Sequence, residues 1–127
     1  MMNRNPISIL LVDDDADTQQ IIAMIASHFE YPLAIASTAK AAMDQLSGIS
    51  PDIVMLDIFL PDSSGYTALN EIRSVTFDHP PKVVAITAYY TTDTQAKMLS
   101  YGFDGYLPKP ISALTLIPYL QNLVSGN

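Results

Sequence analysis

The sequence predicts an α/β fold in which five parallel strands alternate with five helices. Short apolar runs rich in β-branched residues alternate with longer segments that carry apolar residues at helical spacing. The connections between these segments are short, and such alternation is typical of a parallel sheet covered by helices on both faces. Hydrophobic residues make up 49% of the 127 residues, enough for one buried core, so we expect a single domain over 1–127 with its core at about 5–125.

The first part of the chain predicts strand, helix, strand and helix in turn. "ISILLV" at 7–12 has apolar residues at both odd and even positions, which is typical of a strand buried on both faces. Residues 17–29 carry apolar side chains along one helical stripe. "LAIA" at 33–36 predicts a short strand, and 37–48 predicts a helix closed by Gly48.

The middle of the chain predicts two further strands on either side of a helix. "DIVMLD" at 52–57 again reads as a doubly buried strand. "LPDSSG" at 60–65 has the composition of a turn, and the helix predicted at 65–75 places Ala68, Leu69 and Ile72 on one face. "KVVAITA" at 82–88 predicts the fourth strand.

The last part of the chain predicts helix, strand and helix. Residues 91–102 form a helical segment that we expect to end at Gly102. "FDGYL" at 103–107 predicts the fifth strand, and "SALTLIPYLQNLV" at 112–124 the last helix. Nothing follows that helix, so the sequence predicts no output domain. A piece cut from a longer protein stays open as an alternative to a free-standing protein.

Composition and charge exclude several classes of protein. The net charge of −7 makes direct binding of nucleic acid unfavourable, because the phosphates would be repelled. The absence of cysteine excludes disulfides and Cys-ligated zinc. The longest uncharged stretch, 111–127, contains Pro118, Gln121 and Asn122, and the apolar run at 7–12 is too short for a signal sequence. We therefore expect a cytoplasmic protein without a membrane span.

Acidic residues stand where two of the predicted strands end. Asp13, Asp14 and Asp15 follow the first strand, and Asp57 ends the third. In flavodoxin-like doubly wound folds the strand order is 2-1-3-4-5, which makes strands one and three neighbours at the point where ligands bind. That order is borrowed from known folds and is not read from the residues. It would bring Asp13, Asp14 and Asp57 into one pocket.

Such a pocket predicts chemistry with a cation and a phosphate. Clustered carboxylates need a cation to neutralise them, and oxygen-only ligands suit Mg²⁺. The ends of strands four and five would add Thr87 and Lys109, whose hydroxyl and ammonium can bind phosphate oxygens. A carboxylate beside the metal can act as a nucleophile and form an aspartyl-phosphate.

The chain resembles the receiver domains of two-component response regulators, of the CheY-like type. The resemblance is carried by four segments in order, "ILLVDDD", "DIVMLDIFLPDSSG", "VVAITA" and "GYLPKP", and it covers about residues 5–125. It implies that Asp57 is the phosphoacceptor. It also implies an Mg²⁺ site formed by Asp57, by Asp14 directly, by Asp13 largely through water, and by the backbone carbonyl of Phe59.

The resemblance also assigns roles near strands four and five. Thr87 would hydrogen-bond one phosphoryl oxygen and Lys109 would pair with another. The Lys109–Pro110 peptide bond would be cis. Thr87 and Tyr106 would act together as a switch, in which Tyr106 turns inward after phosphorylation. Asp15 occupies a variable position of the family, and there we expect a helix N-cap.

The function implied is that of a signalling phosphoacceptor, either as a free-standing receiver or as a receiver domain cut from a larger hybrid kinase or regulator. A histidine kinase or phosphotransfer protein would phosphorylate Asp57 in a Mg²⁺-dependent reaction, and the modified protein would control a downstream protein target. The chain would be no enzyme beyond its own phosphorylation and dephosphorylation. Phe59 and Tyr89 are bulky where they would flank the path of water, which predicts slow loss of phosphate. The charge-free segments 18–29 and 111–127 would offer a docking face.

Two other functions fit parts of the sequence. A phosphatase of the haloacid dehalogenase type also uses an aspartate nucleophile on a parallel sheet, and Asp13, Asp15 and Asp17 have part of its spacing, but Thr18 lies one position late. The chain also lacks room for a substrate cap. A receiver that has lost phosphorylation and serves as a constitutive adaptor is the third class; the intact acids, Thr87 and Lys109 argue against it.

Overall fold

The computed structural model describes residues 6–126 and contains the alternation that the sequence predicts. The strands are β1 Ile9–Val12, β2 Leu33–Ala36, β3 Ile53–Asp57, β4 Lys82–Thr87 and β5 Gly105–Pro108. The helices are α1 Ala16–His28, α2 Ala39–Leu46, α3 Gly65–Arg73, α4 Thr94–Tyr101 and α5 Ala113–Val124. Among the described residues, no helix combines the length and apolar character needed to cross a membrane.

The strands form one parallel sheet in the order β2-β1-β3-β4-β5, which confirms the predicted flavodoxin-like, doubly wound topology. Val12 pairs with Leu56, so Asp13 and Asp57 lie at equivalent levels of neighbouring strands. On the neighbouring strands β4 and β5, Thr87 pairs with Pro108. The register therefore brings the ends of β1, β3, β4 and β5 to one edge of the sheet.

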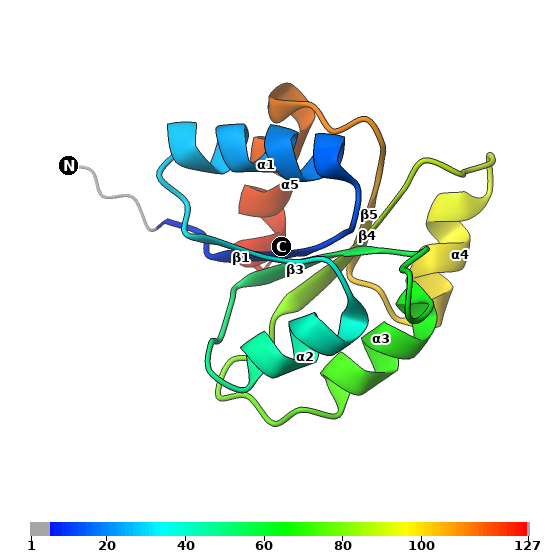
Figure 1. Ribbon diagram of the computed structural model, residues 1–127. Coiled ribbons are helices and arrows are strands. Elements are labelled where there is room, and N and C mark those ends of the chain that lie inside the picture. The colour runs from blue at the N-terminus through cyan, green and yellow to red at the C-terminus, as the bar shows by residue number, and fades with distance from the viewer. Residues whose placement is uncertain (1–5, 127) are drawn as a thin grey trace.

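Helices cover both faces of this sheet (Figure 1). On one face, α1 and α5 contribute Ile22, Leu116 and Leu120 to a common buried cluster. On the other face, α2 and α3 pack their buried side chains, among them Leu46 and Leu69, against the sheet. Every residue of β1 and β3 is buried, and so is every residue of β4 after Lys82, because helices cover both faces of these strands.

Polar side chains begin three of the helices. Asp15 caps α1 by accepting a hydrogen bond from the N–H of Thr18 at 3.1 Å, which confirms its predicted role. Thr38 caps α2, and Ser64 caps α3. These caps fix where each helix leaves the edge of the sheet that carries the acids.

Glycines behave differently at the ends of α2 and α4. Gly102 ends α4 with φ +112°, a left-handed conformation that glycine adopts without strain, as predicted. The prediction that Gly48 closes α2 is wrong: the helix ends at Leu46 with Ser47 as its C-cap, and φ of Gly48 is not positive. The N–H groups of Gly48 and Ile49 reach the carbonyl of Gln45, so the chain leaves the helix without a left-handed residue.

Candidate functional site

Three carboxylates meet where β1 and β3 end. Asp13 follows β1 directly, and its N–H donates to the carbonyl of Ala36 at 3.0 Å, which holds it beside β2. Asp57 is the last residue of β3. Asp13, Asp14 and Asp57 each present an oxygen, and these oxygens lie within 4.8 Å of one another. The structure thus brings together the acids that the sequence predicts.

The three acids differ in exposure. Asp13 is fully buried, Asp57 is 6% exposed, and Asp14 faces solvent. Burial raises the pKa of Asp13 from 3.8 to about 6, although the ammonium of Lys109 and the N–H of Asp15 act in the opposite direction. Burial therefore penalises the charge of this carboxylate, and a cation at the site would relieve that penalty.

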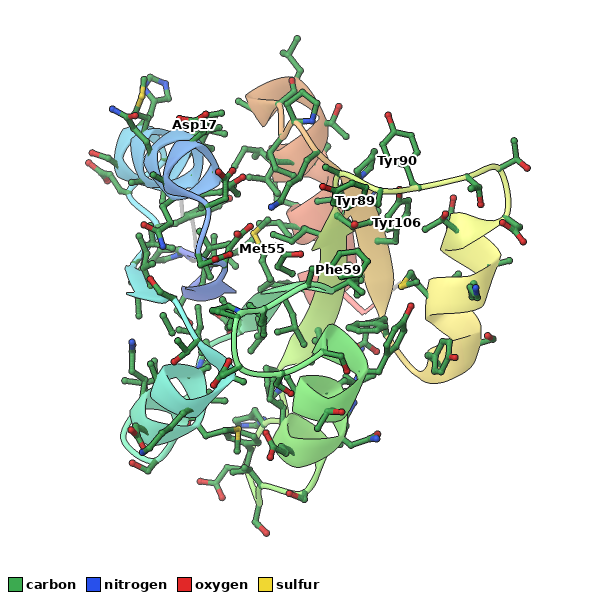
Figure 2. All side chains as sticks on the ribbon, turned by 45° about the vertical axis from the view of Figure 1, so that its right-hand side comes forward. Asp17, Met55, Phe59, Tyr89, Tyr90 and Tyr106 are labelled. Atoms are coloured by element: carbon green, nitrogen blue, oxygen red, sulfur yellow. The ribbon has the colours of Figure 1, made fainter. Side chains whose placement is uncertain are left out.

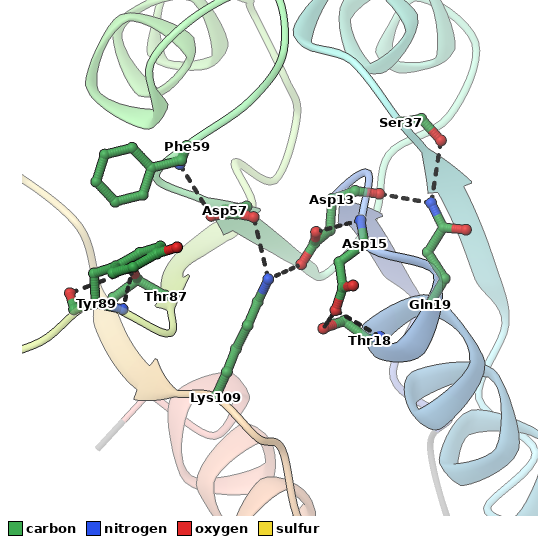
Figure 3. Close-up of polar contacts among 10 residues, drawn as sticks. All are labelled: Asp13, Asp15, Thr18, Gln19, Ser37, Asp57, Phe59, Thr87, Tyr89 and Lys109. Atoms are coloured by element: carbon green, nitrogen blue, oxygen red, sulfur yellow. Dashed lines mark hydrogen bonds and ion pairs between the residues drawn. The ribbon is translucent and has the colours of Figure 1, made fainter.

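Lys109 enters the pocket from the end of β5 (Figure 3). Its Nζ lies 2.8 Å from Oδ2 of Asp13 and 3.2 Å from Oδ2 of Asp57. The Lys109–Pro110 peptide bond is cis, as predicted, and the N–H of Lys109 donates to the carbonyl of Thr87 at 2.9 Å. Burial disfavours the ammonium, but contact with Asp13 and the charges of Asp13 and Asp57 outweigh it and raise the pKa of Lys109.

The acid cluster fits a hard divalent cation. Its donors are carboxylate oxygens, the ligands that Mg²⁺ accepts in proteins. Within residues 6–126, Oδ2 of Asp13 is the one buried side-chain oxygen or nitrogen without a hydrogen-bond partner, and the ammonium of Lys109 contacts it as an ion pair. The side chain of Asp57 accepts a hydrogen bond from the N–H of Phe59 at 3.0 Å, which brings the Phe59 backbone to the rim of the cluster.

Thr87 lies at the end of β4 and is 2% exposed. Its hydroxyl accepts a hydrogen bond from the N–H of Tyr89 at 3.0 Å and is 3.4 Å from the carbonyl of Tyr89, so it is held by the β4–α4 connection. A cleft of about 430 Å³ opens beside it, lined also by Tyr66, Tyr90 and Met98. Room therefore exists next to Thr87 for side chains to rearrange.

Aromatic side chains surround this part of the site (Figure 2). The rings of Phe59 and Tyr89 meet edge to face, with centroids 5.4 Å apart, and are 60% and 76% exposed. Tyr106 is half-buried on β5. Its pKa is raised mainly by burial and to a lesser degree by the nearby Tyr90. The predicted switch residue thus lies beside the aromatic rim.

Three residues that sequence patterns did not single out also bear on the site. Gln19 donates from Nε2 to the carbonyl of Asp13 at 2.6 Å and to the hydroxyl of Ser37 at 3.1 Å. Asp62 binds the N-terminus of α2, and Tyr119 of α5 binds the backbone of β5. The contacts of Gln19 with Ser37, of Asp62 and of Tyr119 join residues 13 to 23 positions apart, whereas Gln19 and Asp13 are six apart, and no local motif marks any of them.

Comparisons with known proteins agree with this arrangement. A family model described as "Response regulator receiver domain" matches residues 9–121. The transcriptional regulatory protein PmrA of Pectobacterium parmentieri is 32% identical over 119 residues, which are 94% of this chain and 53% of PmrA. The chain thus spans about half the length of that relative.

Two solved structures are similar over nearly the whole chain. The CheY-like receiver domain from Methylobacillus flagellatus has a TM-score of 0.83 at 24% identity, covering 94% of this chain and 99% of that one, a likeness of fold. The receiver domain of sensor histidine kinase PA1611 from Pseudomonas aeruginosa has a TM-score of 0.79 at 26% identity, covering 95% and 99%. It was solved with a magnesium ion coordinated in its active site cleft.

Proposed function

Since the chain belongs to the response regulator receiver domain family of two-component signalling, we propose that Asp57 is its phosphoacceptor. The observation that carries the proposal is the position of Asp57 at the end of β3, 3.2 Å from Nζ of Lys109 and within the cluster formed with Asp13 and Asp14. A nucleophilic carboxylate, a nearby cation and a set of metal-binding oxygens are the parts that phosphoryl transfer to a protein needs.

The proposed reaction transfers a phosphoryl group from a phosphohistidine of a kinase or phosphotransfer protein. A carboxylate oxygen of Asp57 attacks phosphorus, and the new O–P bond forms as the P–N bond breaks. The electron pair of that bond stays with the imidazole nitrogen, which then takes up a proton. Lys109 pairs with a phosphoryl oxygen and stabilises its growing negative charge. The protein catalyses only its own phosphorylation and dephosphorylation, so it is no enzyme in the ordinary sense.

The proposed metal is Mg²⁺. Asp13, Asp14, Asp57 and the backbone carbonyl of Phe59 would hold it, with Asp14 as the direct and accessible ligand and Asp13 acting largely through water. When bound, Mg²⁺ supplies positive charge that offsets the negative charge of the phosphoryl oxygens. The raised pKa of the buried Asp13 supports this assignment, because a carboxylate with penalised charge gains from a nearby cation.

Thr87 and Tyr106 form the proposed switch. Once Asp57 is phosphorylated, the Thr87 hydroxyl leaves the backbone of Tyr89 and donates to a phosphoryl oxygen. Tyr106 then turns toward the space beside Thr87. The cleft next to Thr87 supports this proposal. Phosphate acts by favouring one of two existing conformations, since it contacts them differently.

The proposed partners are a histidine kinase or phosphotransfer protein and a downstream protein target, in the cytoplasm. Helices α1 and α5 lie on the same side of the sheet (Figure 1), and residues 18–29 and 111–127 carry no formal charge with His28 neutral. Met24 and Leu114 are 67% and 90% exposed on these helices. A neutral face with exposed apolar side chains suits protein docking. We propose no direct binding of nucleic acid or of a membrane.

Acetyl phosphate with Mg²⁺ tests the phosphoacceptor. Intact-mass spectrometry should show one added phosphoryl group on the wild type and none on Asp57→Asn. A phosphoryl group on the variant would refute the assignment. Continuous turnover of a phosphomonoester would instead indicate a phosphatase of the haloacid dehalogenase type. Asp15, one of the aspartates that match the spacing of that family, already serves as the N-cap of α1. Failure of the wild type to bind Mg²⁺ would indicate a constitutive adaptor.

A further inference from the structure

We propose that Asp62 is a positioning residue for the phosphorylation site. Its carboxylate anchors the β3–α3 loop, residues 58–64, to the N-terminus of α2 and so holds Phe59 in place beside Asp57. The inference rests on the proposed function, because Phe59 matters as a rim residue of the phosphorylation site.

The inner end of the loop is tied to β3 and α3. The N–H of Phe59 donates to Oδ1 of Asp57 at 3.0 Å, and the N–H of Gly65 donates to the carbonyl of Ile58 at 2.7 Å. A Cβ atom on Gly65 would lie 2.7 Å from Cα of Ile58, so only glycine permits this approach. The outer turn is closed within the loop by the N–H of Leu60, which donates to the carbonyl of Ser63 at 3.2 Å, and none of these bonds reaches α2.

Asp62 joins this outer turn to α2. Its Oδ1 accepts from the N–H of Ala39 at 2.9 Å and its Oδ2 accepts from the N–H of Lys40 at 3.1 Å. Both bonds join a carboxylate to a helix N-terminus, where backbone dipoles favour negative charge. The bonds from Ala39 and then Lys40 lower the pKa of Asp62, so the carboxylate is charged at neutral pH.

The ordinary cap of α2 is a different residue. Thr38 accepts from the N–H of Ala41 at 3.0 Å, three positions along the same helix. Asp62 lies 23 positions from Ala39 and joins two separate segments. Its bonds therefore fix a loop in space as well as the start of a helix.

The helix that receives Asp62 is itself fixed to the acid pocket. The carbonyl of Ala36, just before α2, accepts from the N–H of Asp13. Gln19 joins the carbonyl of Asp13 to the hydroxyl of Ser37. A continuous frame thus runs from Asp13 through the start of α2 and Asp62 to the loop of Phe59 and back to Asp57. Removing Asp62 deletes the two hydrogen bonds that join the loop of Phe59 to the start of α2.

The test compares Asp62→Ala with Thr38→Ala, since both remove a cap from α2 but only the first releases the loop. Hydrogen exchange at the amide of Phe59 should become about tenfold faster in Asp62→Ala, the factor expected for loss of a hydrogen bond to a charged group, and change little in Thr38→Ala. The Kd for Mg²⁺, measured by calorimetry, should rise by about threefold or more in Asp62→Ala alone. Asp62→Asn, which keeps one acceptor oxygen, should fall between wild type and Asp62→Ala.

Equal effects of Asp62→Ala and Thr38→Ala on both measurements would overturn the proposal, because Asp62 would then be a helix cap only. This result is distinct from failure of the proposed function, in which the wild type itself gains no phosphoryl group. Should Asp62→Ala not fold, the comparison of Asp62→Asn with Thr38→Ala decides in the same way.

Discussion

The ammonium of Lys109 lies 2.8 Å from Oδ2 of Asp13, closer than it lies to the carboxylate of the proposed phosphoacceptor. Asp13 is fully buried, so this cation offsets the most deeply placed negative charge of the pocket. It does not offset that charge completely, since the pKa of Asp13 remains raised to about 6. The buried carboxylate of Asp13 therefore provides negative charge for binding a cation but lowers the stability of the folded protein.

Asp13→Asn should stabilise the protein at neutral pH when a chelator removes divalent cations. The folded pKa of about 6 exceeds the unfolded value of 3.8, so the folded state binds more protons between these values and stability falls as pH rises through them. The variant should gain on the order of 1–3 kcal/mol in unfolding free energy at pH 7 and almost nothing near pH 4, measured by urea denaturation.

Asp78→Asn is the control, because Asp78 is an exposed acid between α3 and β4. It should leave stability unchanged at both pH values. A pH-independent effect of Asp13→Asn, or a loss of stability at pH 7, would contradict the role of burial.

Mg²⁺ should raise the midpoint of urea unfolding of the wild type, and it should raise the midpoint of Asp14→Asn much less. A ligand that binds only the folded state stabilises it by about 2.7 kcal/mol at a hundred times its Kd. Asp14 is the exposed member of the cluster, whereas Asp17 is an exposed acid in the first turn of α1 outside the cluster. Asp17→Asn should keep the full response to Mg²⁺; if it loses as much as Asp14→Asn, the cluster is not the binding site.

Phe59→Asn should shorten the lifetime of the phosphorylated protein by about threefold or more. Phe59 and Tyr89 form an edge-to-face pair at the rim of the pocket, and replacing the ring by an amide admits the attacking water. The lifetime is measured by following loss of the phosphoryl mass after removal of acetyl phosphate. Leu114→Asn, at a position 90% exposed on α5, is the control. A half-life that lengthens or barely changes in Phe59→Asn would count against this role.

Gly105→Ala should destabilise the protein by roughly 1–3 kcal/mol, the usual range for overpacking. The hydroxyl of Tyr119 accepts from the N–H of Tyr106 at 2.8 Å, and a Cβ atom on Gly105 would lie 2.3 Å from that hydroxyl. Because β5 has a strand on only one side, this hydroxyl replaces the missing strand partner.

Gly48→Ala provides the matched comparison in urea denaturation. The nearest atom to a Cβ there is the carbonyl oxygen of Gln45 at 3.8 Å, an ordinary contact, so stability should hardly change. Tyr119→Phe should recover part of the loss in Gly105→Ala, since it removes the closest atom but leaves ring carbons at 3.0 and 3.1 Å. Equal stability of Gly105→Ala and the wild type would show that α5 shifts freely.

Local patterns were sufficient to predict the strands, the helices and the acids at their ends. β1 and β3 are buried on both faces, which their unbroken apolar runs indicated, and Asp15 caps α1 as its position before a helical stripe suggested. Gly48 was misjudged because the last turn of α2 closes on the carbonyl of Gln45 without a left-handed residue. The strand order is confirmed, but it was borrowed from known folds.

The sequence by itself determined which residue types end each strand, because periodicity and turn chemistry act over a few neighbouring residues. Only the tertiary structure decided that Lys109 lies nearest Asp13, that Thr87 is held by Tyr89, and which distant partners Asp62 and Tyr119 find. Most of these contacts join segments widely separated along the chain. Their geometry depends on how helices and strands pack together, a property that no short stretch of sequence contains.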